Sequence, residues 1–144
     1  MIAIGPLHPA DRAAWQQLFE GYNTFYERTL PPETYDEKWK AFLADDTIHA
    51  LCARAGGEVV GIVHFLKHPS TTSQDVCYLQ DLFTAPEARG RGVGRALIEA
   101  VADWARQQDC CRVYWHTNEQ NETAQRLYDR IAERKPFVFY RQEL

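Results

Sequence analysis

The stretch that decides the fold is Ala85-Pro86-Glu87-Ala88-Arg89-Gly90-Arg91-Gly92-Val93-Gly94-Arg95-Ala96-Leu97. It follows an apolar run, residues 76–83, that predicts a buried strand, and it opens an amphipathic helix predicted from about residue 92 to residue 108. The first turn of a helix carries unpaired backbone N–H groups and the positive end of the helix dipole. Because glycines there let the backbone approach an anion closely, the stretch predicts a phosphate-binding turn.

The spacing of the glycines excludes two common phosphate-binding motifs. A dinucleotide-binding fingerprint needs a third glycine three residues after the second, and that place holds Arg95 in one register and Leu97 in the other. A Walker A loop needs Gly-Lys followed by Ser or Thr, which is absent here. What remains is Arg-x-x-Gly-x-Gly, formed by Arg89, Gly92 and Gly94. A glycine-rich turn without a ligand is the alternative reading of this motif taken alone.

The order of the predicted elements indicates a layered domain. Hydrophobic periodicity predicts strand, two helices, three strands, helix, strand, helix and strand. The strands are expected at residues 2–4, 48–54, 59–66, 76–83, 112–117 and 137–140, and the helices at 9–25, 36–43, 92–108 and 121–133. Gly56-Gly57 predicts a hairpin turn between the second and third strands. Helices that interrupt a mixed sheet predict an α/β or α+β fold, with residues 1–144 as a single domain.

Composition and charge limit the classes of function. With 45% apolar and 12% aromatic residues among 144, the chain can form a core, and a formal charge of −4 offers no basic surface for nucleic acid. No apolar run reaches membrane-spanning length, and no signal peptide is expected at the N-terminus. The four cysteines form no Cys-x-x-Cys pair, so we expect reduced thiols in a cytoplasmic protein, with Cys77 a small buried residue.

A second motif lies on the last predicted helix. Asn121-x-x-Ala124-x-x-x-Tyr128 places an amide and a phenol two helical turns apart, which predicts that they share one face. The small Ala124 between them leaves a shallow groove on that face. A slender ligand fits such a groove, although a tyrosine on an apolar helix face is more often part of the core.

These two motifs together resemble those of the GNAT superfamily of N-acetyltransferases. Arg89-x-x-Gly92-x-Gly94 resembles the family's pyrophosphate-binding motif, Pro86 and Leu97 match its extended pattern, and the order of elements resembles the family's over nearly the whole chain. The resemblance implies a GNAT fold and transfer of an acetyl group from acetyl-CoA to a primary amine, by direct attack in a ternary complex. The segment 78–83 is most similar to small diamine- and histone-acetyltransferase-like members.

The resemblance also implies roles for individual residues. It assigns pantetheine binding to Asn121 and Ala124, and protonation of the leaving CoA thiolate to Tyr128, since a tyrosine with a pKa of about 10 is protonated at neutral pH. The backbone N–H that stabilises the thioester oxygen falls near Leu82 or Phe83, where the family splays this strand from the next. The pyrophosphate contacts fall on Arg89, Gly90, Arg91, Gly92, Val93, Gly94 and Arg95.

The general base is not evident from the sequence. Gln80 stands where several relatives have a glutamate, and an amide does not accept a proton usefully. Asp81 is one residue further, so we expect it to face the opposite side of the strand and to organise the fold. Two alternatives remain for how the acceptor amine loses its proton. A water held by Gln80, His116 or Glu119 removes it, or the amine arrives already partly neutral.

The first two helices supply the acceptor side of the cleft in the family. On that basis Tyr22, Tyr26 and Glu27 are expected to form the acceptor wall, with His116 lining the site. The expected acceptor is a polyamine, an amino acid or a related small amine. A protein lysine or N-terminal amine is the alternative acceptor, and an acyl-CoA sensor or a partner-binding domain without turnover are alternative functions. No metal site is expected, because His64 and His68 lie on a strand and a loop, with no acidic or Cys partner expected nearby.

The C-terminus departs from the family pattern. Lys135-Pro136-Phe137 stands where the family often has Gly-Phe, and only one short strand is expected to follow. A short strand leaves an unpaired sheet edge, which relatives of this small type often cover with a second subunit. We therefore expect a homodimer with residues 137–141 at or near the interface.

Overall fold

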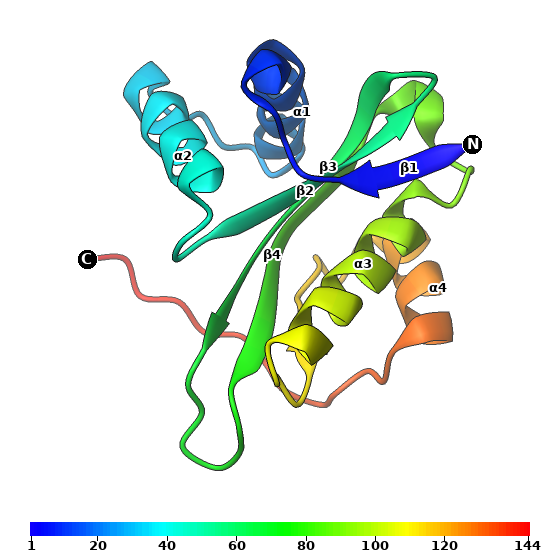
Figure 1. The fold of residues 1–144 in the computed structure, drawn as a ribbon. Helices are drawn as coiled ribbons and strands as arrows, with labels where there is room; N and C mark the ends of the chain where they lie inside the picture. The colour runs from blue at the N-terminus through cyan, green and yellow to red at the C-terminus, as the bar shows by residue number, and fades with distance from the viewer.

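A five-stranded sheet forms the centre of the computed structural model, which describes residues 1–144 (Figure 1). Its strand order follows the chain, with antiparallel pairing from β1 to β4 and parallel pairing of β4 with β5. The strands are β1 (Ile2–Gly5), β2 (His49–Ala55), β3 (Glu58–His68), β4 (Val76–Thr84) and β5 (Val113–Tyr114). The helices are α1 (Arg12–Phe25), α2 (Pro32–Ala44), α3 (Val93–Gln107) and α4 (Glu122–Ile131), with single 3-10 turns η1 (Pro9–Asp11) and η2 (Pro86–Ala88).

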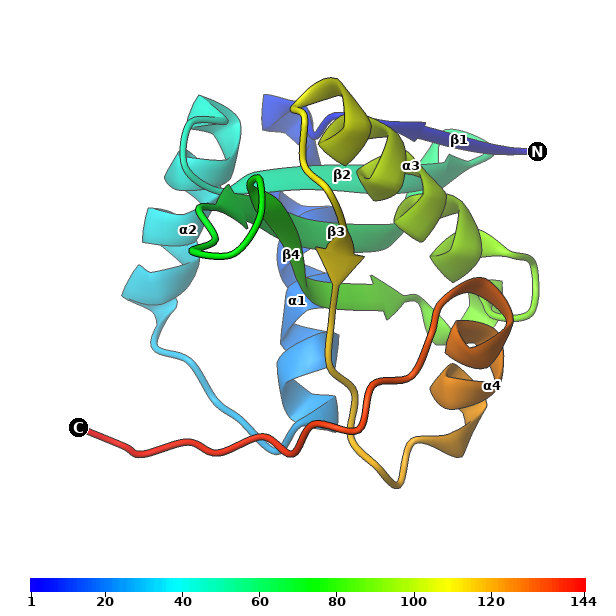
Figure 2. The same ribbon diagram turned by 90° about the horizontal axis from the view of Figure 1, so that it is seen from below.

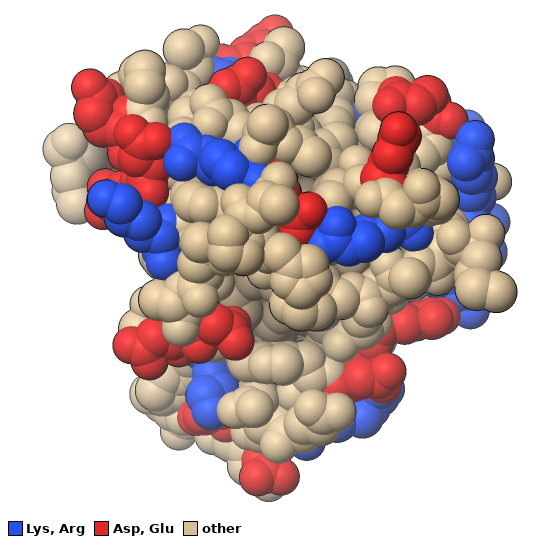
Figure 3. Space-filling model, turned by 45° about the horizontal axis from the view of Figure 1, so that its top comes forward, with Lys and Arg blue, Asp and Glu red and all other residues tan.

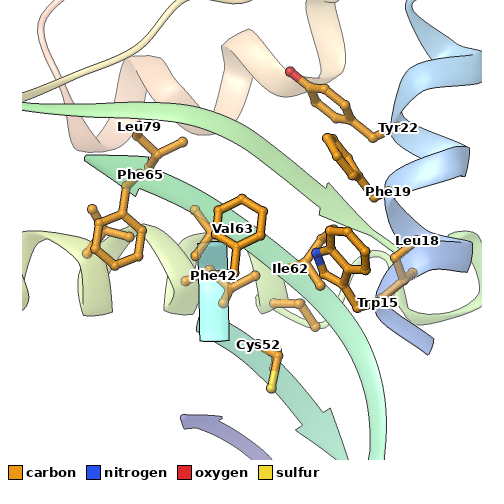
Figure 4. Packing of buried hydrophobic residues seen from close by; sticks show 14 of the residues in the cluster. Trp15, Leu18, Phe19, Tyr22, Phe42, Cys52, Ile62, Val63, Phe65 and Leu79 are labelled. Atoms are coloured by element: carbon orange, nitrogen blue, oxygen red, sulfur yellow. The ribbon is translucent and has the colours of Figure 1, made fainter. Parts of the chain in front are cut away.

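The helices cover the two faces of the sheet in pairs. Figures 1 and 2 show α1 and α2 on one face and α3 and α4 on the other. Trp15, Phe19 and Tyr22 project from α1 towards the sheet (Figure 4) and belong to a core cluster of 22 buried residues. The mixed α/β fold and most of the predicted elements are therefore confirmed.

Two glycine positions fix how the sheet is connected and packed. Gly56 and Gly57 join β2 to β3 with φ of 60° and 85°, the left-handed pair that a tight two-residue hairpin requires. At Gly61 of β3, an added Cβ would lie 2.7 Å from a methyl carbon of Val93, the first residue of α3. The close contact at Gly61 therefore sets where the N-terminus of α3 lies against the sheet.

Two predicted strands differ from the structure. β5 has only two residues instead of the expected 112–117, because its pairing with β4 ends at Tyr78–Tyr114 and the chain then diverges. Residues 137–140 form no strand: no backbone–backbone hydrogen bond involves residues 133–144, which run back from α4 as an extended segment (Figure 2). The expected last strand is therefore wrong, since no strand edge of this chain lies in register with it.

Residues of both charge signs lie on the face of the molecule seen in Figure 3, where Lys and Arg side chains alternate with Asp and Glu. None of the helices is both long and apolar enough to cross a lipid bilayer. The four side chains from Phe137 to Tyr140 are 66–88% exposed and form a continuous apolar strip on the C-terminal segment.

Candidate active site

The glycine-rich turn before α3 is an open backbone surface. Gly90 and Gly92 have φ of 80° and 79°, and a Cβ added at either would meet nothing within 4 Å. No turn, cap or side-chain hydrogen bond is donated by the backbone N–H groups of residues 90–95, and the first helical bond runs from the Ala96 N–H to the Gly92 carbonyl at 3.0 Å. These free N–H groups lie at the positive end of the α3 dipole, which suits an anion such as a diphosphate.

The arginines of the turn surround this surface. The Arg89 Nε donates to the Thr84 carbonyl at 3.2 Å, and its guanidinium carbon lies 5.4 Å from the centre of the Phe83 ring. Arg95 pairs with Glu99 at 2.9 Å, whereas Arg91 forms no salt bridge and is exposed. The turn therefore keeps two arginines without a carboxylate partner, Arg89 and Arg91, beside its free N–H groups.

A gap opens between β4 and β5 next to this turn. The two strands pair only at Cys77–Val113 and Tyr78–Tyr114, so the edge of β4 is free from Leu79 onwards. The Ala85 N–H donates to the Val60 carbonyl of β3 at 2.8 Å. Because N–H groups along a strand alternate sides, the Phe83 N–H faces β3 and the Leu82 N–H faces the gap. Of the two residues expected to present a free donor there, the geometry selects Leu82.

A β-bulge in β4 changes the direction of two side chains. The register with β3 passes from Phe65–Leu79 to His64–Asp81, which leaves Gln80 as the extra residue. A bulge interrupts the alternation of side chains, so Gln80 and Asp81 both face the α1/α2 side and line the same cavity. The expectation that Asp81 faces the opposite side from Gln80 is therefore wrong, and the bulge is the reason.

Beside the gap between β4 and β5 lies a small cavity whose wall consists mostly of predicted site residues. It brings together residues from α1, β4, the segment after β5 and α4. Its walls are Tyr22, Tyr26, Leu79, Gln80, Leu82, Trp115, His116 and Tyr128. Trp115, which the sequence reasoning missed, lies with its ring centre 5.4 Å from that of Tyr128. An aromatic residue beside His116 at the end of a strand was the available signal.

Tyr128 is held in its protonated form by its surroundings. Burial raises the pKa of its phenol to about 12, with a smaller contribution from the nearby Tyr26. Burial also raises the pKa of Tyr22, whose hydroxyl donates to the Gln80 carbonyl at 3.3 Å. At neutral pH the cavity therefore presents phenols that donate protons and do not accept them.

The remaining predicted residues lie outside this cavity. Asn121 is the N-cap of α4 and not a helical residue, since its Oδ1 accepts the Ala124 N–H at 3.2 Å and its NH2 group has no partner. Glu27 lies in the turn after α1 with φ of 55°, is exposed and lines neither this cavity nor the larger one. Arg28, the next residue, lines the larger cavity instead.

A buried chain of hydrogen bonds supports the α1/α2 side of the sheet. The Trp15 Nε1–H donates to His64 Nε2 at 3.0 Å, and His64 Nδ1 lies 2.9 Å from Asp81 Oδ2. Because an indole N–H can only donate, His64 accepts at Nε2 and donates its Nδ1–H to Asp81. His64 thus has the acidic partner that the sequence reasoning did not find, and Asp81 does link the sheet to α1.

No cluster of three or more His, Cys, Asp or Glu side chains is placed to hold a metal ion.

Comparisons with known proteins identify the family. Residues 15–132 match the acetyltransferase (GNAT) family, and the chain belongs to this family of N-acetyltransferases. It is 34% identical to D-amino-acid N-acetyltransferase HPA3 of Saccharomyces cerevisiae, over 97% of this chain and 89% of that protein. It is 38% identical to aminoglycoside N(6')-acetyltransferase type 1 of Stenotrophomonas maltophilia, over 76% and 74% of the two chains.

A solved structure gives the same result for the fold. The ribosomal-protein-alanine N-acetyltransferase from Brucella melitensis biovar Abortus 2308 superposes with a TM-score of 0.84 at 26% identity, covering 100% of both chains. The five-stranded sheet and its helices are thus those of a GNAT enzyme.

Proposed function

We propose that the protein transfers an acetyl group from acetyl-CoA to the primary amine of a small molecule, by direct attack in a ternary complex. The observation that carries this proposal is the gap between β4 and β5, where the free Leu82 N–H, Gln80 and Tyr128 meet. The named relatives acetylate D-amino acids, aminoglycosides and a ribosomal-protein alanine according to their names, which supports an amine acceptor.

The residues around the gap fit acetyl-CoA. The open turn of residues 89–95 offers backbone N–H groups to the diphosphate, because Gly90 and Gly92 carry no Cβ that would fill the space. The free NH2 group of Asn121 and the small Ala124 are available to the pantetheine arm at the start of α4. The Phe83 ring packs against Gly21 of α1 and lies under the Arg89 guanidinium, so it supports the start of the turn and lines neither cavity.

Each group at the gap supplies one step of the chemistry. Bound acetyl-CoA supplies the thioester, so that a C–N bond forms, the C–S bond breaks and CoA leaves as a thiol. The Leu82 N–H donates to the carbonyl oxygen as its negative charge grows. The Tyr128 hydroxyl gives its proton to the sulfur. The acceptor nitrogen loses two protons in all, one to water and one that restores the Tyr128 hydroxyl.

Gln80 binds the water that removes the first proton, since its amide hydrogen-bonds water but takes no proton itself. The observation behind this role is that Gln80 lies on the bulge and lines the cavity that holds Tyr128. His116 lines the same cavity, and Glu119 lies in the following turn, so both are further holders of that water. A Gln80→Glu variant with an unchanged basic limb in its pH–rate profile would count against the role of Gln80.

Calorimetric titration with acetyl-CoA, followed by a thiol-release assay with a panel of amines, tests the proposed function. Binding with turnover supports the transferase, and the best amine gives the acceptor class. Binding without turnover on small amines, protein N-termini or lysines would indicate an acyl-CoA sensor. A folded protein that does not bind acetyl-CoA would overturn the proposal.

We propose further that the protein forms a homodimer through residues 137–141. The apolar strip Phe137–Tyr140 is exposed, its backbone is unpaired, and the Phe139 ring lies 5.0 Å from that of His116. A second chain that pairs with this segment would cover the strip beside the acceptor site. Light scattering at micromolar concentration tests this, and a monomeric mass would contradict it.

A cytoplasmic location completes the proposal. All four cysteines are free, and burial raises the pKa of the Cys77 thiol to about 12, which keeps it unreactive. Free thiols of this kind persist in a reducing compartment. Fractionation of cells that express the tagged protein tests this location.

A further inference from the structure

A second, larger cavity lies between α1, α2 and the β3–β4 pair. Its volume is about 310 Å³, at the low end of the range of about 300–1,000 Å³ found for small-molecule sites. It contains one acidic and two basic side chains, Asp81, Arg28 and Lys38. Gln80 lines both this cavity and the one that holds Tyr128, so the two cavities adjoin the same residue of the β4 bulge.

The acidic group of the cavity has one edge available. Asp81 Oδ2 accepts the Nδ1–H of the buried His64, which fixes the orientation of the carboxylate. The Tyr22 hydroxyl lies close to the same carboxylate, which helps to raise the pKa of Tyr22, and 14% of the Asp81 side chain is exposed, so one edge of the carboxylate still reaches the cavity. A carboxylate that is held on one oxygen and open at one edge binds an ammonium group well.

The two basic groups carry charge that the protein does not neutralise. The Arg28 Nε donates to Oδ1 of Asn23 at 3.0 Å, and Asn23 is 2% exposed and donates to the Tyr35 hydroxyl at 3.1 Å. Arg28 is thereby oriented by a buried amide, while its two terminal NH2 groups form no salt bridge. Lys38 forms none either, so both cations are free to bind an anion at the cavity.

The rest of the cavity wall mixes polar and apolar side chains, and its polar members are Asn23, Thr34, His64 and Gln80. The apolar side chains come from α1, α2, β3 and the loops between them. They are Phe19, Leu30, Phe42, Ile48, Phe65 and Leu66. Such a wall accepts a hydrocarbon side chain, and burial of apolar surface adds to affinity in proportion to its area.

We infer that this cavity binds the acceptor as a free amino acid with an apolar side chain, its ammonium on Asp81 and its carboxylate on Arg28 and Lys38. This inference rests on the proposed function and names its acceptor class. It separates the acceptors of the three relatives, because a polycationic aminoglycoside and the N-terminal alanine of a protein both lack a carboxylate next to the amine. Arg28 and Lys38 would repel the former and find no partner on the latter.

The test compares acceptors that differ only in the carboxylate. Thiol release is measured with leucine, leucinamide and tobramycin, using both enantiomers of the first two. We expect a KM at least tenfold lower for leucine than for leucinamide, and no saturation with tobramycin. Equal or better use of leucinamide or tobramycin would overturn the inference.

Variants of the cationic residues make the test specific. In Arg28→Gln and Lys38→Gln we expect the KM for leucine to rise about tenfold while that for leucinamide stays within twofold, since only the carboxylate contact is lost. Arg106→Gln, which removes an exposed arginine paired with Asp103 at the far end of α3, is the matched control and should change neither. A rise of KM for both acceptors alike in Arg28→Gln and Lys38→Gln would indicate a merely structural role and contradict the inference.

A binding measurement separates this inference from the proposed function. Leucine and leucinamide are titrated calorimetrically into protein saturated with CoA, which requires no turnover. Leucine binding at least tenfold tighter than leucinamide supports the amino-acid site even if no thiol is released, a result that would contradict the transferase alone. Thiol release with another amine and no binding of leucine would contradict the amino-acid site alone.

Discussion

The turn of residues 89–95 and the cavity under α1 and α2 are the two halves of the proposed site, and they are built in different ways. The turn is made of backbone N–H groups and of glycines that leave them open. The cavity is made of side chains from α1, α2, β3 and β4 that lie far apart in the sequence. A backbone site must be contiguous and leaves a short motif, whereas a side-chain site leaves none. The part that would bind acetyl-CoA can therefore be predicted from the sequence, whereas the part that would bind the acceptor amine can be recognised only in the folded structure.

Gly92→Glu should break the backbone half alone. The substitution places a carboxylate at the N-terminus of α3 and a Cβ at a residue with φ of 79°, so we expect acetyl-CoA affinity to fall at least 100-fold. Gly56→Glu is the matched control, because Gly56 has φ of 60° but lies in the β2–β3 hairpin. Each variant should lose about 1–2 kcal/mol of stability from the left-handed backbone, and calorimetry should show a binding defect only in the first. Equal affinity in both variants would mean that the turn holds no ligand.

Tyr128→Phe should separate chemistry from binding within the same half. Loss of the proton donor should lower kcat about 100-fold, with acetyl-CoA affinity within twofold of the original, because only a hydroxyl is removed. Since the pKa of Tyr128 is about 12, its ionisation should not reduce activity below about pH 10. Steady-state kinetics from pH 6 to pH 10 check both points. Tyr114→Phe is the control, because the Tyr114 hydroxyl bonds to His68 at 2.7 Å and Tyr114 lines neither cavity, and an unchanged kcat in Tyr128→Phe would remove its assigned role.

The same contrast explains what the sequence could predict. Local patterns predicted the helices, the first four strands and the Gly56-Gly57 hairpin, because periodicity and turn chemistry are encoded within a few residues. The short β5 and the absence of a strand at 137–140 could not be read locally, since a strand exists only where a partner edge lies in register.

The site follows the same division. Gln80, Leu82 and Tyr128 were predicted from the family's pattern, and His116 from its place at the end of a predicted strand, and all four line one cavity. The direction of Asp81 was missed, because the bulge at Gln80 arises from the register between β3 and β4 and not from either strand alone. Arg28 was missed for a similar reason: an arginine after a helix looks like any exposed residue until the buried Asn23 that orients it is known.

Trp15→Phe should affect the side-chain half more than the backbone half. It removes the donor to His64 Nε2 and leaves that nitrogen unpaired in a residue that is 2% exposed. We expect the free energy of unfolding to fall by about 1–3 kcal/mol, and the KM for the acceptor to rise while acetyl-CoA affinity is kept. Trp104→Phe is the control with the same volume change, since the Trp104 indole makes no hydrogen bond and packs against Phe65 and His49. An equal loss of stability in both variants, measured by urea unfolding, would mean that packing and not the hydrogen bond matters at Trp15.

The smallest expected effect concerns the ion pair between Asp11 and Arg54, which links the start of α1 to β2. It thereby helps to hold α1, one wall of the proposed acceptor cavity, in place. Hydrogen bonds from Arg54, at 2.6 and 2.9 Å, hold the pKa of Asp11 at about 2, below its ordinary value, although burial opposes the shift. Because the folded pKa is depressed, this contribution to stability is present above about pH 4 and is lost as the pH falls towards 2.

Asp11→Asn should therefore lower the free energy of unfolding by about 1 kcal/mol at pH 7 and by almost nothing at pH 2. Urea unfolding at the two pH values measures the difference. Asp36→Asn is the control, because Asp36 pairs with Arg12 at 2.6 Å but is 62% exposed, and an exposed pair contributes about 0–1 kcal/mol. Acetyl-CoA affinity should not change in either variant, since the turn of residues 89–95 precedes α3, on the face of the sheet opposite α1 and α2. A loss of stability in Asp11→Asn that persists at pH 2 would show that the amide disturbs packing and that the carboxylate's charge is not what ties α1 to the sheet.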